Sequence, residues 1–89
     1  MALRYESKTT ASFWECYRDL PSGVRLAADE AFEQFEKNAD HPGLNFVRLK
    51  SDRSVCTARV NKQYRAVGSF GNPIVWFWIG THADFDKMF

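Results

Sequence analysis

The sequence has no apolar run that approaches the roughly 18 residues needed to cross a bilayer. Its first residues also contain no apolar core of the length found in signal peptides. The two cysteines, Cys16 and Cys56, form no motif, and neither stands at ligand spacing from a histidine. We therefore expect a cytoplasmic protein with reduced thiols and without a metal site, a cofactor or a membrane partner.

The chain also lacks an excess of charge of either sign. Twelve Lys and Arg residues stand against eleven Asp and Glu residues, which leaves a formal net charge of +1. Phosphate backbones attract proteins mainly through cationic charge, so this balance argues against strong non-specific binding to nucleic acid. A local basic patch remains sufficient to bind RNA.

Aromatic residues, in contrast, are abundant: eight Phe, three Trp and three Tyr among 89 residues. A chain of this length buries roughly 60–65% of the surface that its unfolded form exposes, so a single modest core is feasible. The apolar fraction of 45% is enough for that core without disulfides or metal. With no repeat, linker or low-complexity segment, residues 1–89 are expected to form one domain.

Two helices are predicted in the first half of the chain. Three hydroxyl groups within residues 9–12 are available to cap the first helix, and Ser12 with Glu15 fits a capping box. The pair Leu20-Pro21 marks a break at which a second helix begins. Loop-forming residues follow over residues 38–43. Two antiparallel helices joined by a tight turn would cover one face of a sheet.

Strands account for most of the remainder. The segments that favour strands are residues 3–8, 44–50, 55–60, 64–70 and 74–79. The last is apolar on both faces, as expected of a central strand covered from two sides. Trp76 and Trp78 are expected to share a face, as core residues or as a platform that stacks on RNA bases. We predict an α+β fold, with a two-helix hairpin on one face of a twisted, mainly antiparallel sheet of four to five strands.

The segment 56–67 carries the most informative pattern, because it places two arginines around a polar turn. A three-residue loop would pair Arg59 with Arg65 on one face, whereas a two-residue loop would pair Arg59 with Tyr64 and separate the arginines. Sequence alone leaves both registers open. A guanidinium is planar, stays charged and binds two phosphate oxygens at once, so a shared face would suit an anion. The alternative is two ordinary surface arginines.

His82 follows the last apolar segment and is flanked by Asp84 and Asp86. Imidazole is the side chain most easily tuned for proton transfer near neutral pH, so His82 is a candidate general acid. The alternative is a tail histidine that caps the sheet. Two cations and one imidazole on a small sheet suggest phosphodiester chemistry in RNA.

The order and spacing of these features resemble the RelE/ParE superfamily of bacterial type II toxins. The resemblance covers nearly the whole chain and is carried by the Leu20-Pro21 junction, the Asn–Pro–Gly loop, residues 58–65 and residues 78–86. It implies a single RelE/ParE-like toxin domain over residues 1–89 that is silenced by a cognate antitoxin. RelE-like members cut messenger RNA in the ribosomal A site without metal, whereas ParE-like members poison DNA gyrase.

The resemblance to the RelE branch implies roles for three residues. Arg65 would hold the scissile phosphate, Arg59 would assist or orient the RNA, and His82 would protonate the leaving 5′ oxygen. The 2′-hydroxyl would be the nucleophile and would leave a cyclic phosphate. Further substrate contacts are expected from Arg48, Lys50, Lys62, Tyr64 and Phe85. The alternatives are a gyrase inhibitor, which has no need of His82, and a non-catalytic interaction module that retains the fold.

Overall fold

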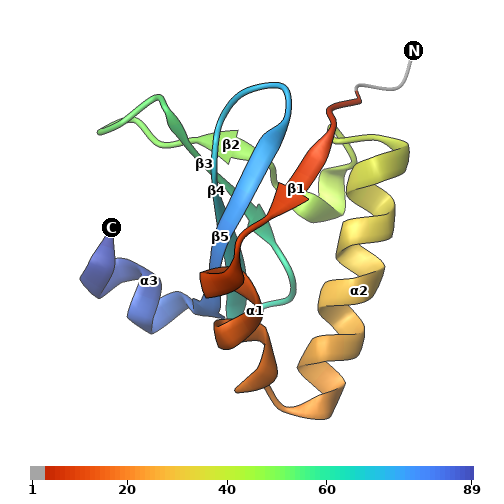
Figure 1. Cartoon of the computed structure of the whole chain (residues 1–89), viewed down its shortest axis with the longest axis vertical. Helices are drawn as coiled ribbons and strands as arrows, with labels where there is room; N and C mark the ends of the chain where they lie inside the picture. The colour runs from red at the N-terminus through yellow and green to blue at the C-terminus, as the bar shows by residue number, and fades with distance from the viewer. Residues whose placement is uncertain (1–3) are drawn as a thin grey trace.

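The computed structural model describes residues 4–89 and has an α+β fold (Figure 1). The first half forms β1 (Ser7–Thr9), α1 (Ala11–Arg18), α2 (Ser22–Lys37) and the short 3-10 helix η1 (Pro42–Leu44). The second half forms β2 (Val47–Arg48), β3 (Val55–Arg59), β4 (Tyr64–Ser69), β5 (Ile74–Thr81) and α3 (His82–Met88). The predicted first strand begins at Leu3, which lies outside the described residues. No helix within residues 4–89 has the length and apolar character that crossing a membrane requires.

The strands form one sheet in the order β1-β5-β4-β3-β2. The pairs β2–β3, β3–β4 and β4–β5 are antiparallel, and only β1–β5 is parallel. The prediction of a mainly antiparallel sheet is therefore confirmed. A parallel pair requires a long crossover, which the helices and the β2–β4 strands supply between β1 and β5. β1 and β2 are left as the two edges.

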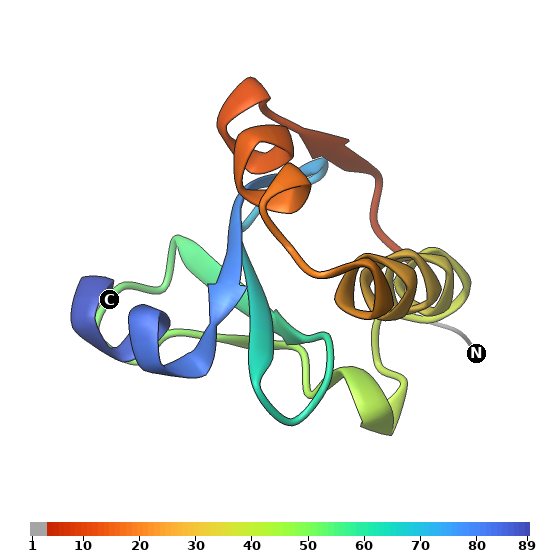
Figure 2. The same cartoon turned by 90° about the horizontal axis from the view of Figure 1, so that it is seen from below.

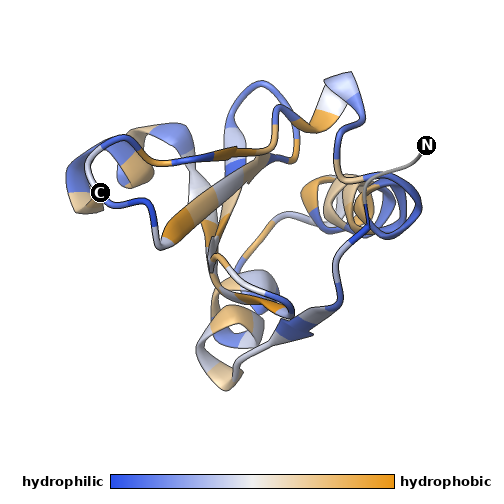
Figure 3. Ribbon diagram, turned by 90° about the horizontal axis from the view of Figure 1, so that it is seen from above, coloured by the Kyte–Doolittle hydropathy of each residue, from blue (hydrophilic) through white to orange (hydrophobic). Residues whose placement is uncertain are grey.

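Helices α1 and α2 lie on the same face of the sheet, as predicted (Figure 2). We call this face the helix side. Phe13 of α1 and Phe35 of α2 belong to one core cluster with Trp76 of β5, and the rings of Phe35 and Trp76 are 5.3 Å apart. Figure 3 shows that α2 turns apolar residues toward the sheet and polar residues toward solvent. Burial of each such aromatic ring contributes about 1.5–3 kcal/mol.

The cap of α1 differs from the predicted capping box. Thr10 is the N-cap, and its Oγ1 accepts a hydrogen bond from the backbone N–H of Phe13 at 3.2 Å. Ser12 lies inside the helix, and its hydroxyl donates to the carbonyl of Phe77 at 3.0 Å. The pairing of Ser12 with Glu15 is therefore wrong, because the Ser12 hydroxyl ties α1 to β5 instead.

The expectation that Trp76 and Trp78 share a face is also wrong. Val67 of β4 pairs with Trp78 and Gly68 pairs with Trp76, so Phe77 is an extra residue in a β-bulge. The bulge turns the two indoles to opposite faces. Trp76 is only 3% exposed in the helix-side core, and Trp78 packs against the aromatic rings at the end of the chain. Trp76 is therefore unavailable to stack on a base.

Helix α3 was not predicted by the sequence analysis. Its N-cap is Thr81, whose Oγ1 accepts from the N–H of Asp84 at 3.1 Å. Phe85 is 9% exposed and lies 6.5 Å from the ring of Trp78. Figure 2 shows α3 on the other side of the sheet from α1 and α2. We call this face the α3 side.

Candidate anion-binding site

The β3–β4 hairpin places Arg59 and Arg65 directly opposite each other. The N–H of Val60 donates to the carbonyl of Tyr64 at 3.0 Å, which leaves residues 61–63 as a three-residue loop. The structure thus has the first of the two registers that the sequence left open. Directly opposed residues of an antiparallel pair have Cβ atoms about 4.5–5.5 Å apart, so the hairpin starts both arginine side chains close together on one face of the sheet.

Asn61 fixes the loop between the arginines. Its Oδ1 accepts from the backbone N–H groups of Gln63 and Tyr64 at 2.8 and 3.0 Å. Its own carbonyl accepts from Nε of Arg59 at 3.3 Å. An Asn that bonds to the backbone two residues ahead stabilises a turn locally. Asn61 therefore sets both the hairpin and the direction of the Arg59 guanidinium.

Arg65 is supported from α3. Its guanidinium carbon lies 5.4 Å from the centre of the Phe85 ring, within the range of a cation–π contact. On the neighbouring strand β5, the residue that pairs with Arg65 is Gly80. A Cβ atom at Gly80 would come within 2.7 Å of the Trp78 ring, so only glycine allows that indole to lie along the strand. The ring of Phe85 thus supports the Arg65 guanidinium, and the indole of Trp78 lies beside Gly80 and that ring.

His82 lies beside the same phenyl ring as Arg65. Its backbone N–H donates to the carbonyl of Gln63 at 2.6 Å, which joins the start of α3 to the hairpin loop. Its ring centre is 6.1 Å from that of Phe85, and its Nε2 is 3.3 Å from Oδ2 of Asp86. The side chain is 44% exposed and accessible to a solute. Arg65 and His82 both contact Phe85, so α3 brings the imidazole to the end of the hairpin.

We call the group formed by Arg59, Arg65, His82 and Phe85 the arginine face. Neither arginine has a carboxylate partner within residues 4–89, where the one ion pair is that of His82 with Asp86. Residues 45–69 contain six Lys and Arg residues and a single carboxylate, whereas α2 contains four carboxylates. The net charge of +1 therefore conceals a partial separation of charge, because half of the twelve cations lie on β2, β3, β4 and their loops, beside a single carboxylate.

The residues expected to contact substrate do not all lie at this face. Lys62 is exposed in the hairpin loop between the two arginines, and Phe85 supports Arg65. The side chain of Tyr64 packs instead against the helix-side core. Tyr64 remains partly exposed and also lines a hollow beside Gly80, Thr81 and Asp84.

Arg48 and Lys50 lie elsewhere on the molecule. Arg48 pairs with Cys56, which is buried in the helix-side core. Because paired residues share a face of the sheet, the Arg48 side chain is on the opposite face from that of Arg59. Its guanidinium carbon is 4.2 Å from the centre of the Phe70 ring. Cys56 is also three residues before Arg59 on β3, a separation of about 10 Å along the strand. Arg48 and Lys50 line a separate open groove at the β2 edge.

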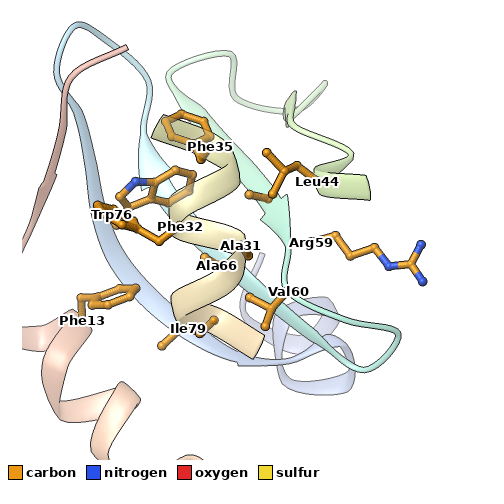
Figure 4. A pocket seen from close by; sticks show the side chains of 12 residues that line it. Phe13, Ala31, Phe32, Phe35, Leu44, Arg59, Val60, Ala66, Trp76 and Ile79 are labelled. Carbon is orange, nitrogen blue, oxygen red and sulfur yellow. The ribbon is translucent and has the colours of Figure 1, made fainter. Parts of the chain in front are cut away.

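A pocket between α2 and the sheet also lies close to Arg59. It encloses about 40 Å³ and is lined almost entirely by apolar side chains, including Phe32, Phe35 and Ile79. Ligand pockets typically hold about 300–1,000 Å³, so this one is a packing gap. Figure 4 shows the guanidinium of Arg59 pointing away from this pocket. Within residues 4–89, no three His, Cys, Asp or Glu side chains gather as a metal site would require.

Two supporting residues were missed by the sequence analysis. Asn61 stands two residues before Gln63 in a polar turn, which is the spacing of an Asx turn, and that signal was present in the sequence. Asp86 is four residues after His82, a spacing that brings side chains together only in a helix. Because α3 was not predicted, Asp86 was not recognised as a fixed partner of the imidazole.

Comparison with known proteins places the chain in a family of toxin domains. The family of the ParE-like toxin domain matches the chain over residues 22–87. No curated protein sequence matches it.

Several solved structures share the fold, including the following three. The first is a chain of the RelB–RelE antitoxin–toxin complex from Methanococcus jannaschii, with a TM-score of 0.72 and 14% identity over 92% of this chain and 98% of that chain. A chain of the RelBE2 toxin–antitoxin complex from Mycobacterium tuberculosis has a TM-score of 0.71 and 18% identity, over 94% of this chain and 98% of that chain. YafQ from Escherichia coli strain BL21(DE3) has a TM-score of 0.62 and 11% identity, over 92% of this chain and 98% of that chain. At these identities, the likeness shows a common fold.

Proposed function

Because the chain belongs to the ParE-like toxin domain family, we propose that it is the toxin of a type II toxin–antitoxin pair and a metal-independent endoribonuclease. The observation that supports the activity most directly is the pairing of Arg59 with Arg65 beside an exposed His82. Two guanidinium groups without carboxylate partners in the described chain suit a phosphodiester, and the imidazole suits proton transfer. Messenger RNA, free or on the ribosome, is the proposed substrate, and a cognate antitoxin is the proposed protein partner.

In the proposed reaction, the 2′-hydroxyl of the RNA attacks the adjacent phosphorus, and the bond to the 5′ oxygen breaks. A 2′,3′-cyclic phosphate and a free 5′-hydroxyl result. Arg65 binds the non-bridging oxygens, where negative charge grows in the transition state, and Phe85 holds its guanidinium in place. A well-placed donor of this kind lowers the barrier by about 3–4 kcal/mol. Arg59 binds the same phosphate or the adjacent phosphate of the RNA.

His82 is the proposed general acid. The leaving 5′ oxygen needs a proton, and a protonated imidazole supplies it. Nε2 of His82 faces Asp86, which orients the ring and leaves Nδ1 for the substrate. General acid catalysis contributes typically 10²–10⁴-fold to a rate, so loss of His82 should slow cleavage by about this factor.

The separated charges support an RNA partner as well. Arg59 and Arg65, with Lys62 in the loop between them, give the hairpin a positive potential that the net charge does not reveal. Such a patch attracts phosphate by releasing counterions, and its binding weakens as salt rises. The ribosome and messenger RNA both present phosphate, and both lie in the cytoplasm, which is the proposed location of the protein.

Inhibition of DNA gyrase is the second candidate function, favoured by the ParE-like description of the matched family. Induced expression in a bacterium separates the two functions. A ribonuclease leaves cut transcripts, whereas a gyrase inhibitor leaves broken DNA and an SOS response. We expect cut transcripts with the native chain, none with Arg65→Ala, and undiminished cutting with Arg18→Ala, which alters an exposed arginine on α1. DNA damage without transcript cutting would favour the gyrase function.

A further inference from the structure

A second group of cations lies at the β2 edge of the sheet, away from the arginine face. Arg48 of β2, with Lys50 and Arg53 of the β2–β3 loop, lines an open groove of about 750 Å³. Ligand pockets typically hold about 300–1,000 Å³, so this groove has room for a ligand, unlike the packing gap beneath α2. The loop of residues 49–54 projects from the sheet beyond β2 and β3 (Figure 1). The groove therefore opens to solvent at an edge of the molecule.

The lining of this groove carries positive charge alone. No carboxylate within residues 4–89 is among the side chains that line it. Asp52 stands between Lys50 and Arg53 in the chain, but its carboxylate accepts hydrogen bonds from the hydroxyl and the backbone N–H of Ser54, at 2.6 and 3.0 Å. None of the three cations forms an ion pair in the described part of the chain. Grouped cations without a counter-charge attract a polyanion.

Arg48 is held in place by two contacts. Its guanidinium carbon lies 4.2 Å from the centre of the Phe70 ring, and its Nε donates to the carbonyl of Arg53 at 2.7 Å. The two terminal nitrogens form no hydrogen bond with residues 4–89. One face of the guanidinium covers the phenyl ring, so the other face is left for a further planar group. Arg48 thus offers free donors to a phosphate and a flat surface to a base.

Aromatic rings lie beside the cations of the groove. Tyr5, Phe46 and Phe70 line it, are partly exposed and pack on one another, with ring centres 5.7–6.3 Å apart. Proteins that bind single-stranded nucleic acids combine these two kinds of side chain, because bases stack on the rings while cations bind the phosphates. An acidic peptide would need the cations alone. The rings therefore favour a nucleic acid as the occupant.

We propose that this groove, which we call the β2 groove, binds a short single-stranded segment of RNA. Arg48, Lys50 and Arg53 bind its phosphates, and one base stacks on the open face of the Arg48 guanidinium. The choice of RNA among nucleic acids rests on the proposed function. The Arg48 side chain is on the opposite face from that of Arg59, and Phe70 follows the end of β4, about 20 Å along the strand from the hairpin loop. The β2 groove is therefore a second contact with RNA, separate from the site of cleavage.

The probe is a fluorescein-labelled octamer of 2′-O-methyl uridine, which has no 2′-hydroxyl to attack and therefore stays intact. Its binding is followed by fluorescence anisotropy with the Arg59→Gln/Arg65→Gln protein, in which the arginine face has lost its two guanidinium groups. We expect a dissociation constant of about 10⁻⁴ M or lower at about 50 mM salt. The logarithm of the affinity should fall with that of the salt concentration with a slope of about −2, because each of three cations contributes about −0.7 on a single strand. An abasic strand of equal length should bind at least about fivefold more weakly.

Variants made in the same background separate charge from stacking. Lys50→Gln with Arg53→Gln should reduce the salt slope to about −0.7, whereas Arg18→Gln, on α1 and outside the groove, should leave it at about −2. Arg48→Lys keeps the charge but removes the flat guanidinium, so it should keep the slope and abolish the advantage of the base-bearing strand over the abasic strand. Lys50 and Arg53 are exposed, so their substitution tests the groove in a folded protein even where Arg48→Lys is destabilising.

Three results would overturn the proposal: no binding of the octamer at millimolar concentration, a salt slope that Lys50→Gln with Arg53→Gln leaves unchanged, or equal affinity for the abasic strand. An octamer of glutamate that binds as tightly as the RNA would identify an acidic protein segment as the occupant, and would equally contradict it. This binding requires no cleavage. A chain that binds the octamer in the β2 groove but cuts no RNA would contradict the proposed function alone, and a chain that cuts RNA without this binding would contradict the present inference alone.

Discussion

Arg59 and Arg65 face each other across the β3–β4 hairpin, with no carboxylate between them in the described part of the chain. Like charges that stand directly opposite on adjacent strands destabilise the pair. We therefore expect the pairing of these cations to lower stability, and we expect a bound anion to remove that cost.

Removal of one charge should accordingly stabilise the folded protein. We expect Arg59→Gln to raise the free energy of unfolding by about 0.2–1 kcal/mol in dilute buffer, because it ends the repulsion across the hairpin. The gain should shrink as salt screens the charges. Urea titrations at low and high salt measure both effects. Arg53→Gln, in the β2–β3 loop, is the control and should leave stability unchanged. Because Arg59→Gln also removes the hydrogen bond from Nε of Arg59 to the Asn61 carbonyl, the salt dependence is decisive, and a stability difference that does not change with salt would show that the pair is not repulsive.

Glycine is required at one position of β5 and dispensable at one position of α2. Gly80→Ala should destabilise by about 1–3 kcal/mol, because the new Cβ would meet the Trp78 ring at 2.7 Å. Gly23→Ala places its Cβ in open space within a helix and should stabilise by about 0.5–1 kcal/mol. Thermal or urea denaturation of the two variants compares them directly. An unchanged stability for Gly80→Ala would mean that the indole moves away freely.

The two cysteines should react at very different rates. Burial raises the pKa of Cys56 from 9.0 to about 11, and the side chain is fully buried, whereas Cys16 is partly exposed. At pH 8, an alkylating reagent should therefore modify Cys16 alone in the folded protein, and both cysteines in urea. Mass spectrometry counts the labels. The folded Cys16→Ser variant should take none, and rapid labelling of that variant would contradict the burial of Cys56.

The same shift sets a dependence of stability on pH. The pKa of Cys56 is higher in the folded state than in the unfolded state, so the unfolded chain loses this proton first as pH rises. The contribution is therefore complete below about pH 9 and is lost between about pH 9 and 11. Urea titrations across this range should show a steeper fall in stability for the native chain than for Cys56→Ala. Parallel curves for the two proteins would contradict the shift.

Local patterns predicted most of the fold. The apolar alternation of β3 and β4 and the proline at the start of α2 predicted these elements within a few residues. Two features were not predicted: a β-bulge, which breaks the two-residue period of a strand, and the cap of a short helix that follows the last strand. The bulge at Phe77 adds one residue to β5 and puts Trp78 on the opposite face of the sheet. A prediction in which successive side chains strictly alternate between the two faces does not include such a residue. The cap of α3 by Thr81 has a sequence signal, a hydroxyl three residues before Asp84, that was not recognised.

The candidate site was less predictable than the fold, because it depends on register and on α3. The choice between a two-residue and a three-residue loop decides whether Arg59 and Arg65 share a face, and the side chain of Asn61 favours the longer loop. The position of His82 beside Phe85 follows from the first turn of α3. Arg48 was expected to contact the substrate together with the arginines, but its pairing with Cys56 puts its side chain on the opposite face from Arg59.

The cleavage of messenger RNA by the purified protein on programmed ribosomes tests the central claim most directly. The native chain should produce fragments that end in a 2′,3′-cyclic phosphate and begin with a 5′-hydroxyl. Arg65→Ala should lower the rate by about 10²–10³-fold and His82→Ala by about 10²–10⁴-fold, while Arg18→Ala cleaves normally. Equal cleavage by native chain and Arg65→Ala, with both shown to be folded, would contradict the assignment of the arginine face as the site of catalysis.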